Sequence, residues 1–428
     1  MLDIRYIREH RDECQERLAV RGDPALPDLI ERAIEADRVR RELIGEVEGL
    51  KAERNARSRE IGDRKREGAD ADDILAEMQK VAARIRALDP ELADVEEELE
   101  SLLLLIPNLP DPRVPPGREG EGEIVLTWGD PPDPPTPDGR FEAHWTIGER
   151  LGLLDLERGA KLTGSGFPLF VGQGARLQRA LIQLMLDTHV SEHGYTELAP
   201  PYLVNRDSMT ATGHLPKFEA DAYRTDPDDL FLVPTAEVPV TNLYRDEILD
   251  GEVLPLAYVA YTPCFRREAG AAGKDTRGLL RVHQFDKVEL VRFVEPARSD
   301  EELEVLTGHA ERVLELLELP YRRILLPGGD LGFANAMTYD LEAWAPGVEA
   351  WLEVSSCSNY DDYQARRANI RFRPGPAEKP RYAHTLNGSG LALARVIVAL
   401  LENHQRPDGS VDLPAALRPY MGVDRLES

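Results

Sequence analysis

The chain has 428 residues, of which 42% are hydrophobic and 30% charged, and its formal net charge at pH 7 is −26. This length is sufficient for two or more domains with a sizeable core. The acidic excess excludes a surface that is basic throughout, so any contact with a nucleic acid must rely on a local basic segment.

The three cysteines, Cys14, Cys264 and Cys357, form neither a CxxC pair nor an even disulfide framework. This spacing argues for a reducing compartment and against a thiolate metal site, so no zinc is expected. Residues 1–20 mix acids and bases, and the longest apolar helix, 391–401, is too short to span a bilayer. We therefore expect a soluble, cytoplasmic protein without a membrane partner.

The N-terminal domain, residues 1–104, is predicted to contain two long helices, over 28–66 and 71–104, separated by a short turn. In the second helix apolar residues recur in steps of three and four: Ile74, Met78, Val81, Ile85, Leu88, Leu92, Val95, Leu99 and Leu102. Such a heptad seam is typical of a coiled coil, and two helices joined by a short turn fold back as an antiparallel pair. Taken alone, this pattern favours a dimerisation coiled coil.

The first of these helices carries a basic segment, residues 51–66, close to the turn. Its cations outnumber its acids and include Lys51, Arg54, Arg57, Arg64 and Lys65. From the residues alone, two interpretations stay open: a solvated helix face, or a local contact for RNA phosphates.

Residues 105–140 are rich in Pro, Gly and Asp, as in LIPNLPDPRVPPG and GDPPDPPTPDGR. This composition predicts an extended linker and a surface loop. From 141 to 428, alternating strands and helices favour an α+β domain built on an antiparallel sheet flanked by helices.

Residues 262–290 predict two strands joined by a Gly/Ala-rich loop whose tip lies at 269–273. Arg266 and Arg267 stand at the end of the first strand, where planar guanidinium groups suit phosphate or carboxylate oxygens. Taken alone, the segment is equally well explained as a surface hairpin with solvated charges.

Two further segments point to the same chemistry. The strand within 351–367 carries Glu353, Ser355 and Ser356, whose hard oxygens suit Mg²⁺ bridging phosphates. The Gly-rich turn and helix at 385–403 place Arg395 on an otherwise apolar helix, where its charge needs an anion. Together the three segments predict a site for a nucleoside triphosphate and a small acid.

These segments resemble motifs 2 (262–290) and 3 (385–403) of the class II aminoacyl-tRNA synthetases. Their amino-acid sequences resemble those of the bacterial seryl-tRNA synthetases in particular. The similar stretches are FRREAGAAGKDTRGLLRVHQFDKVE, VPTAEV at 233–238, EVSSCSN at 353–359 and LNGSGLA, with HGYTELAPPYLV at 193–204 as motif 1. The resemblance covers essentially the whole chain. It implies a class II sheet domain over 141–428 and a serine–tRNA ligase, which forms seryl-adenylate from L-serine and ATP and transfers the seryl group to the 3′ end of tRNA(Ser).

The resemblance also implies site residues. The ATP-binding set is Arg266, Arg267, Glu268, Phe285, Glu353, Val354, Ser355, Ser356 and Arg395, with Arg266, Glu268 and Arg395 as the catalytic members. Mg²⁺ is expected on Glu353 and Ser356. The serine-binding set is Thr235, Ala236, Glu237, Arg266, Glu289, Asn387 and Ser389. Without the resemblance, Glu289 would be read as the buried partner of a nearby arginine.

The resemblance also implies that the N-terminal helices form an arm that binds the variable arm of the tRNA. This arm would recognise the shape and the phosphates of the RNA. The expected contacts are Lys51, Arg54, Arg57, Arg64 and Lys65. A homodimer with motif 1 at its interface is expected, and the family also charges tRNA(Sec) where a host has one.

Two residues depart from the family pattern. Met337 stands where a lysine is usual, which removes one cation, and Arg267 stands where a serine is common. They suggest a hypothesis of a duplicate, inhibitor-tolerant enzyme. A second alternative is a ligase that loads a carrier protein, although such relatives lack the helical arm, and a third is an inactive tRNA-binding regulator.

Overall fold

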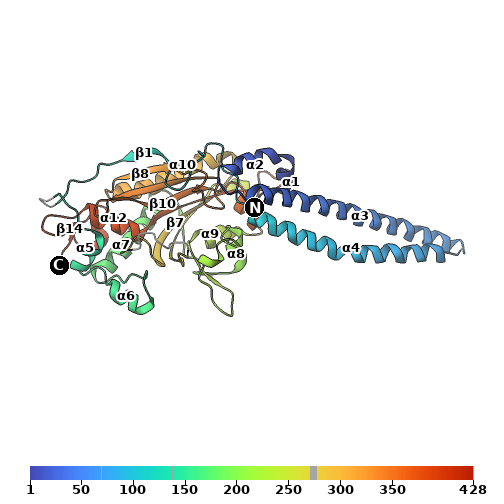
Figure 1. Cartoon of the computed structure of the whole chain (residues 1–428), viewed down its shortest axis with the longest axis horizontal. Helices are drawn as coiled ribbons and strands as arrows, with labels where there is room; N and C mark the ends of the chain where they lie inside the picture. The colour runs from blue at the N-terminus through green and yellow to red at the C-terminus, as the bar shows by residue number, and fades with distance from the viewer. Residues whose placement is uncertain (69, 136–138, 270–276, 428) are drawn as a thin grey trace. The chain divides into compact units, whose positions relative to one another are not determined.

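The structure, a computed structural model, describes residues 1–68, 70–135, 139–269 and 277–427 (Figure 1). Most of the predicted loop tip at 269–273, and the end of the second Pro-rich run at 136–138, lie outside the described residues. The chain divides into two compact units, one formed by residues 1–19 and 23–107 and the other by residues 20–22 and 108–428.

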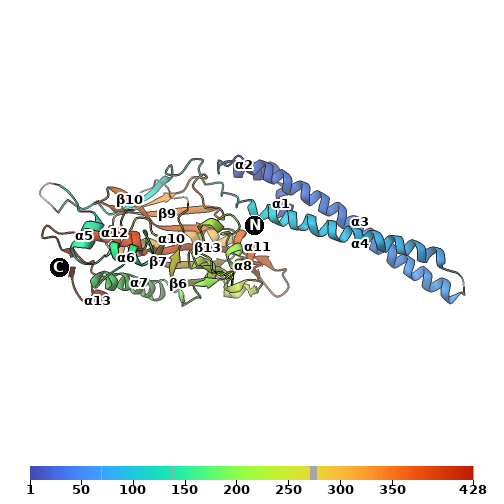
Figure 2. The same cartoon turned by 60° about the horizontal axis from the view of Figure 1, so that its bottom comes forward.

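The first unit is helical. Helices α3 (Leu26–Arg66) and α4 (Asp72–Leu105) lie side by side as an antiparallel pair (Figures 1 and 2), and α1 (Ile4–Glu9) and α2 (Arg11–Ala19) contact α3. The predicted seam of α4 faces inward, because Ile74, Val81, Ile85, Leu88, Leu99 and Leu102 are all buried. The long helical arm expected from the heptad pattern is therefore confirmed.

The second unit is built on a sheet that has eight strands among the described residues, in the order β1-β8-β9-β10-β13-β7-β6-β2. Neighbouring strands are antiparallel except β2 and β6, which are parallel. The strands are β1 (Glu123–Trp128), β2 (Thr196–Leu198), β6 (Leu256–Phe265), β7 (Gln284–Val294), β8 (Tyr321–Leu325), β9 (Met337–Ala345), β10 (Ala350–Asn359) and β13 (His384–Ala392). The α+β expectation is confirmed.

Shorter strands connect the remaining loops: β3 (Leu203–Val204), β4 (Phe231–Leu232), β5 (Ile248–Asp250), β11 (Arg371–Arg373), β12 (Arg381–Tyr382), β14 (Val411–Asp412) and β15 (Arg425–Leu426). The helices of this unit are α5 (His144–Arg150), α6 (Leu156–Thr163), α7 (Gln173–Ser191), α8 (Arg206–Ala211), α9 (Glu237–Thr241), α10 (Ser299–Leu316), α11 (Tyr363–Ala368), α12 (Leu393–Asn403) and α13 (Arg418–Met421).

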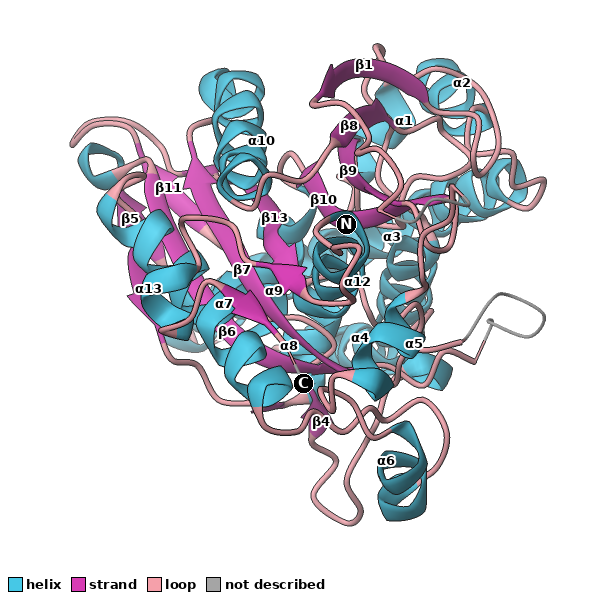
Figure 3. Cartoon of the chain, turned by 90° about the vertical axis from the view of Figure 1, so that its left-hand side faces the viewer, coloured by secondary structure: helices cyan, strands magenta, loops and turns pink. Residues whose placement is uncertain are grey.

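Helices α7, α10 and α12 cover one face of the sheet (Figure 3) and share its main hydrophobic core. Two glycines of β13 let helices approach closely. A Cβ at Gly388 would lie 2.6 Å from Leu306 Cδ2 on α10, and one at Gly390 would lie 2.6 Å from His189 Nε2 on α7. Because side chains alternate along a strand, Asn387 and Ser389 point to the opposite face.

The segment interpreted as a linker, 105–140, contributes the edge strand β1, which pairs with β8 while its side chains stay exposed. Its partner strand is distant in the sequence, so no local pattern signals the pairing. The three cysteines are free and buried, as expected of core residues. No helix among the described residues is both long and apolar enough to pass through a membrane.

Candidate active site

A cavity of about 370 Å³ opens on the sheet face to which Asn387 and Ser389 point. Strands β6, β7, β10 and β13 meet there with the start of α12. Most of the site residues implied by the sequence line it: Glu237, Arg266, Glu268, Phe285, Glu289, Glu353, Ser356, Asn387, Ser389 and Arg395. Four segments that are distant in the sequence are thus brought to one cavity.

Five of the implied residues are not part of this lining. Val354 and Ser355 are buried on the other side of β10, and the Ser355 hydroxyl donates to Ser389 O at 2.7 Å. Thr235 and Ala236 are buried beneath the cavity wall. Arg267 is exposed, and its backbone N–H donates to Asp221 O at 2.8 Å.

A β-bulge in β10 brings Glu353 and Ser356 into the same cavity. Residues three apart in a regular strand point to opposite faces. Here the register with β9 shifts between Glu353 and Ser355, which reverses the alternation. Ser358, two residues further on, then also lines the cavity. The sequence names these residues, but the bulge decides that they face the same way.

Strand β7 supplies three alternating residues to the cavity: Phe285, Lys287 and Glu289. Lys287 forms an ion pair with Glu289 and is 7% exposed. Sequence reasoning did not single out Lys287, although the two-residue period of the strand would have found it. It also expected an arginine as the alternative partner of Glu289, whereas the partner is this lysine.

Arg266 is held at the end of β6. Its backbone N–H donates to His283 O at 2.9 Å, and its Nε donates to Pro234 O at 3.3 Å. The guanidinium carbon lies 5.3 Å from the centroid of the Phe285 ring. The terminal nitrogens of Arg266 are therefore offered to the cavity from a fixed position.

Next to it, Glu268 has a positive φ of 52° and forms an ion pair with Arg281. This backbone conformation is uncommon outside glycine and is typical of turns and functional sites. Arg281 also lines the cavity, although the sequence analysis did not select it.

On the opposite wall Arg395 connects the start of α12 to β10. Its Nη1 donates to Glu353 O at 2.8 Å and to Glu353 Oε2 at 3.2 Å. Partial removal from water inside the cavity opposes ionisation of Glu353, but the charges of Arg395 and then Arg266 outweigh this effect and lower its pKa. Glu353 is thus ionised at neutral pH.

Asp340 of β9 is the register partner of Ser356, so the two residues lie side by side on neighbouring strands. Burial, followed by the charge of Glu353, raises the pKa of Asp340 well above its usual value. The carboxylate and hydroxyl oxygens of Glu353 and Ser356 are a donor set that fits a hard divalent cation with further ligands from water or phosphate. No cluster of three or more His, Cys, Asp or Glu able to hold a metal occurs among the described residues.

A smaller polar network lies at the other end of the cavity. Thr235 Oγ1 donates to Glu289 Oε2 at 2.9 Å, and Gln364 Nε2 donates to Glu237 Oε1 at 2.7 Å. Tyr360 donates from its hydroxyl to Asn387 Oδ1 at 2.9 Å. Burial raises the pKa of Glu237, although the charge of Lys287 and the hydrogen bond from Gln364 oppose the rise.

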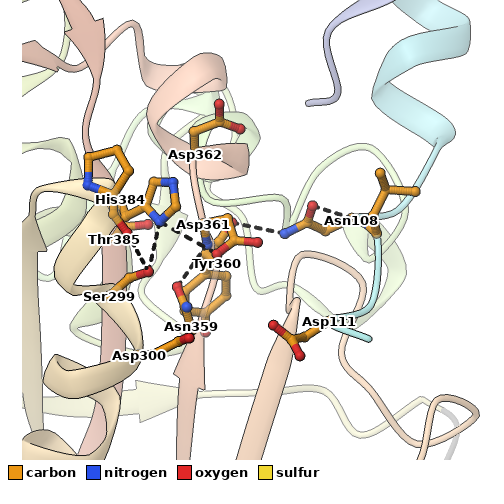
Figure 4. Close-up of polar contacts among 12 residues, drawn as sticks. Asn108, Asp111, Ser299, Asp300, Asn359, Tyr360, Asp361, Asp362, His384 and Thr385 are labelled. Atoms are coloured by element: carbon orange, nitrogen blue, oxygen red, sulfur yellow. Dashed lines mark hydrogen bonds and ion pairs between the residues drawn. The ribbon is translucent and has the colours of Figure 1, made fainter. Parts of the chain in front are cut away.

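The turn that carries Tyr360 is tied down by a second polar cluster (Figure 4). Asn108 Nδ2 donates to Tyr360 O at 2.8 Å, and His384 Nδ1 lies 3.0 Å from Ser299 Oγ and 3.5 Å from Asp361 Oδ1. Serine and aspartate face the same ring nitrogen, and Ser299 Oγ also donates to Pro296 O. This arrangement is not a nucleophilic triad, which needs the two on opposite nitrogens. It holds the turn.

Met337, where the sequence analysis noted a missing cation, is 2% exposed and belongs to the main core. It is not part of the cavity lining.

In the first unit, two of the five basic residues predicted to bind tRNA are already paired. Arg57 contacts Glu60 and Glu77, and Arg64 contacts Glu60 and Asp73. By contrast, Lys51, Arg54 and Lys65 have no ion-pair partner among the described residues, and the two lysines are exposed. Their charges are available to an outside anion.

Comparison with known proteins agrees with this geometry. Residues 1–110 match the seryl-tRNA synthetase N-terminal domain, and residues 217–404 match the tRNA synthetase class II core domain (G, H, P, S and T). Serine–tRNA ligases of Geobacillus sp. (strain WCH70) and Gemmatimonas aurantiaca are 57% and 55% identical, each over 99% of this chain and 99% of their own. The crystal structure of seryl-tRNA synthetase from Pyrococcus horikoshii complexed with ATP is similar with a TM-score of 0.93 and 38% identity, over 100% of this chain and 99% of that one.

Proposed function

The chain belongs to the seryl-tRNA synthetase family of class II aminoacyl-tRNA synthetases, and we propose on that premise how its residues share the reaction. It is a serine–tRNA ligase, with ATP as a substrate. In the first step the serine carboxylate attacks the α-phosphorus of ATP and diphosphate leaves. In the second, the 3′-terminal ribose hydroxyl of the tRNA attacks the seryl carbonyl carbon and AMP leaves.

Activation joins two anions, so cations must hold them together. Arg266 binds the serine carboxylate and the α-phosphate, since its guanidinium is fixed at the cavity by Pro234 O and Phe285. Arg395 binds the γ-phosphate end from the opposite wall, and the ring of Phe285 stacks on adenine. Glu268 contacts the nucleotide beside Arg266, while the exposed position of Arg267 does not favour its predicted ATP contact.

Glu353 and Ser356 would hold Mg²⁺, because the bulge in β10 turns both oxygens to the cavity. When bound, the cation would neutralise the phosphate oxygens. Asp340 lies beside Ser356 on the neighbouring strand and adds a further acidic side chain near these oxygens.

The serine side chain fits the polar end of the cavity. Glu237 binds the ammonium group, with Thr235 and Ala236 as the loop that carries it. Glu289 and Ser389, which face each other across β7 and β13, bind the hydroxyl, and Asn387 lines the same end. Alanine lacks the hydroxyl, so it would leave these buried groups without a hydrogen-bond partner and would bind more weakly than serine. Threonine is excluded because its side chain is too large.

The arm contacts tRNA through Lys51, Arg54 and Lys65, whose charges have no partner among the described residues. Arg57 and Arg64 contribute less because acids already neutralise them. Charging of tRNA(Sec) stays a prediction.

The protein acts as a homodimer through the motif 1 region. β2 is an edge strand of the sheet, and the nearby Val190, Tyr202 and Leu203 are exposed apolar residues. The unpaired edge of β2 and the exposed apolar side chains near it are suited to contact with a second copy of this chain. Light scattering should give a molar mass of twice that of the chain. Leu203→Glu places a charge at this surface and should shift the measured mass toward that of a single chain.

No observation favours a carrier-protein ligase, an inactive regulator or an inhibitor-tolerant duplicate, and the buried Met337 removes the main motive for the last of these. The observation that carries the proposal is the convergence of Arg266, Glu353 and Arg395 with the Glu237 and Glu289 pocket in one cavity. The test is charging of bulk bacterial tRNA with labelled serine, with alanine, threonine and cysteine as parallel controls. Serine-only charging supports it, whereas no charging with any amino acid contradicts it.

A further inference from the structure

Glu402 of α12 and His144, the first residue of α5, form a buried pair that neither the ATP site nor the serine site uses. Both side chains are 0% exposed. His144 Nδ1 lies 2.8 Å from Glu402 Oε1, which also accepts the His144 backbone N–H at 2.8 Å. Glu402 Oε2 accepts the backbone N–H groups of Gly347 and Val348 at 2.8 and 3.1 Å. Both oxygens of Glu402 are thus engaged, and the His144 ring is held in one orientation.

The contacts of the ring determine which nitrogen of His144 carries the proton. Nε2 lies 3.0 Å from the backbone N of Leu279, whose N–H can only donate. Nε2 is therefore the acceptor. A neutral imidazole must then carry its proton on Nδ1, which donates a hydrogen bond to Glu402. A carboxyl group, an imidazole ring and a backbone N–H are thus linked in series within the core.

Leu279 belongs to the stretch that leads into β7 and forms part of the active-site wall. Leu279, Leu280 and Arg281 all line the cavity. The two residues after Leu279 are also held, because Leu280 O accepts a hydrogen bond from Arg395 Nε at 3.3 Å and Arg281 pairs with Glu268. The position of this wall therefore depends on three successive contacts, of which the first is made by His144.

Gly278 passes directly over the His144 ring. Its φ is +67°, and a Cβ at this position would overlap His144 Nε2. Glycine is therefore required by both the backbone conformation and the close approach. On the next residue, the guanidinium carbon of Arg277 lies 4.3 Å from the ring centroid of Trp145. The start of α5 thus contacts three consecutive residues of the stretch.

Helix α12 acts on the same stretch at two points. Arg395 at its start donates directly to Leu280 O, and Glu402, about two turns later, acts on Leu279 through His144. We propose that His144, oriented by Glu402, is a positioning residue for ATP, because it holds the cavity wall at Leu279 in the place at which the nucleotide binds. The proposal rests on the serine–tRNA ligase activity and adds to it a residue that does not itself contact the substrates.

The test compares two variants of the full-length enzyme. His144→Asn retains an N–H group for Glu402 but has no acceptor for Leu279, whereas His144→Gln can place its amide oxygen near the position of Nε2. In ATP–diphosphate exchange, His144→Asn should raise the KM for ATP by about 10-fold or more, since a buried N–H loses its acceptor. The KM for serine should stay within about 2-fold of wild type. His144→Gln should recover most of the ATP affinity.

Gly278→Ala tests the same contact from the other side. Its methyl group would displace Leu279 from His144 Nε2, so it should also raise the KM for ATP and not that for serine. His404→Asn is the matched control, because His404 Nε2 lies 3.0 Å from Leu317 O and the residue is not part of the cavity lining. Both KM values should stay within about 2-fold of wild type in this control.

Nitrogen NMR of the wild-type enzyme, labelled with ¹⁵N-histidine, gives an independent readout. The His144 ring should carry its proton on Nδ1, and a proton on Nε2 would overturn the proposal. An unchanged KM for ATP in both His144→Asn and Gly278→Ala would also overturn it. Equal rises in the KM values for ATP and serine would do the same, because a general loss of structure affects both substrates. If the wild-type enzyme shows no serine-dependent exchange and charges no tRNA, the proposed function fails instead.

Discussion

At the scale of single residues, the proposed active site relies on cations that are fixed in position by neighbouring groups. Arg266 is held by a backbone carbonyl and an aromatic ring, and Arg395 is held by Glu353. Preorganised charge stabilises the transition state without reorganisation during the reaction. Arg266 lines the cavity, whereas its neighbour Arg267 is exposed, so substitutions of the two can be compared directly.

We expect Arg266→Lys to lower ATP–diphosphate exchange by about 100- to 1,000-fold, because an ammonium cannot make the bidentate contact of a guanidinium. Arg267→Lys should lower it less than 10-fold, about 1.4 kcal/mol or less in activation free energy. The measurement is exchange at saturating serine and ATP. Similar losses in both variants would show that Arg267 does contact ATP.

Glu237 predicts a pH dependence. Burial raises its pKa, so this carboxyl group keeps its proton to a higher pH than an ordinary glutamate. Only the ionised form pairs with the serine ammonium, so the KM for serine should rise as pH falls through this raised pKa. Glu237→Gln should raise the KM at pH values above this pKa and remove the pH dependence. A wild-type KM that does not change between pH 5 and pH 8 would contradict this role.

At the scale of elements, the arm is held together by the seam between α3 and α4. Leu88 is fully buried there, whereas Leu75 on the same helix is 39% exposed. Their substitution therefore tests the packing of the helical pair directly.

Leu88→Ala should destabilise the arm by about 2–5 kcal/mol, since it removes buried methyl groups and leaves a cavity. Leu75→Ala is the control and should have a small effect. Amide hydrogen exchange of residues 26–105 measures the local stability, and diphosphate exchange should be unchanged in both variants. Equal protection in the two variants would argue against a packed seam.

At the scale of the whole molecule, the net charge of −26 contrasts with the unpaired cations of the arm. Binding to RNA releases counterions in proportion to the phosphates that cations neutralise. Local charge can therefore direct an acidic protein to tRNA, while the rest of the surface repels it.

Replacing Lys51, Arg54 and Lys65 together by alanine should weaken tRNA binding and reduce the slope of log affinity against log salt by about 2–3. Arg57→Ala, which removes a cation already paired with Glu60 and Glu77, should change the slope by less than about 1. Filter binding across a range of salt concentrations measures both. An unaltered slope in the triple variant would place the tRNA contact elsewhere.

The sequence alone determined the elements whose signals are local. The heptad period predicted the helical pair, because burial along one helix face repeats at short intervals. The resemblance of four short stretches identified the family and named half of the residues that line the cavity.

Only the tertiary structure decided how these residues meet. The β10 bulge that turns Glu353 and Ser356 to one side, the Lys287–Glu289 pair and the β1 edge strand within the presumed linker all depend on pairing between distant segments. The pairing of Arg57 and Arg64 with acids likewise follows from the packing of two helices. A local pattern states which side chains are present, but register and packing between distant segments decide which way each one points and which charges are already neutralised.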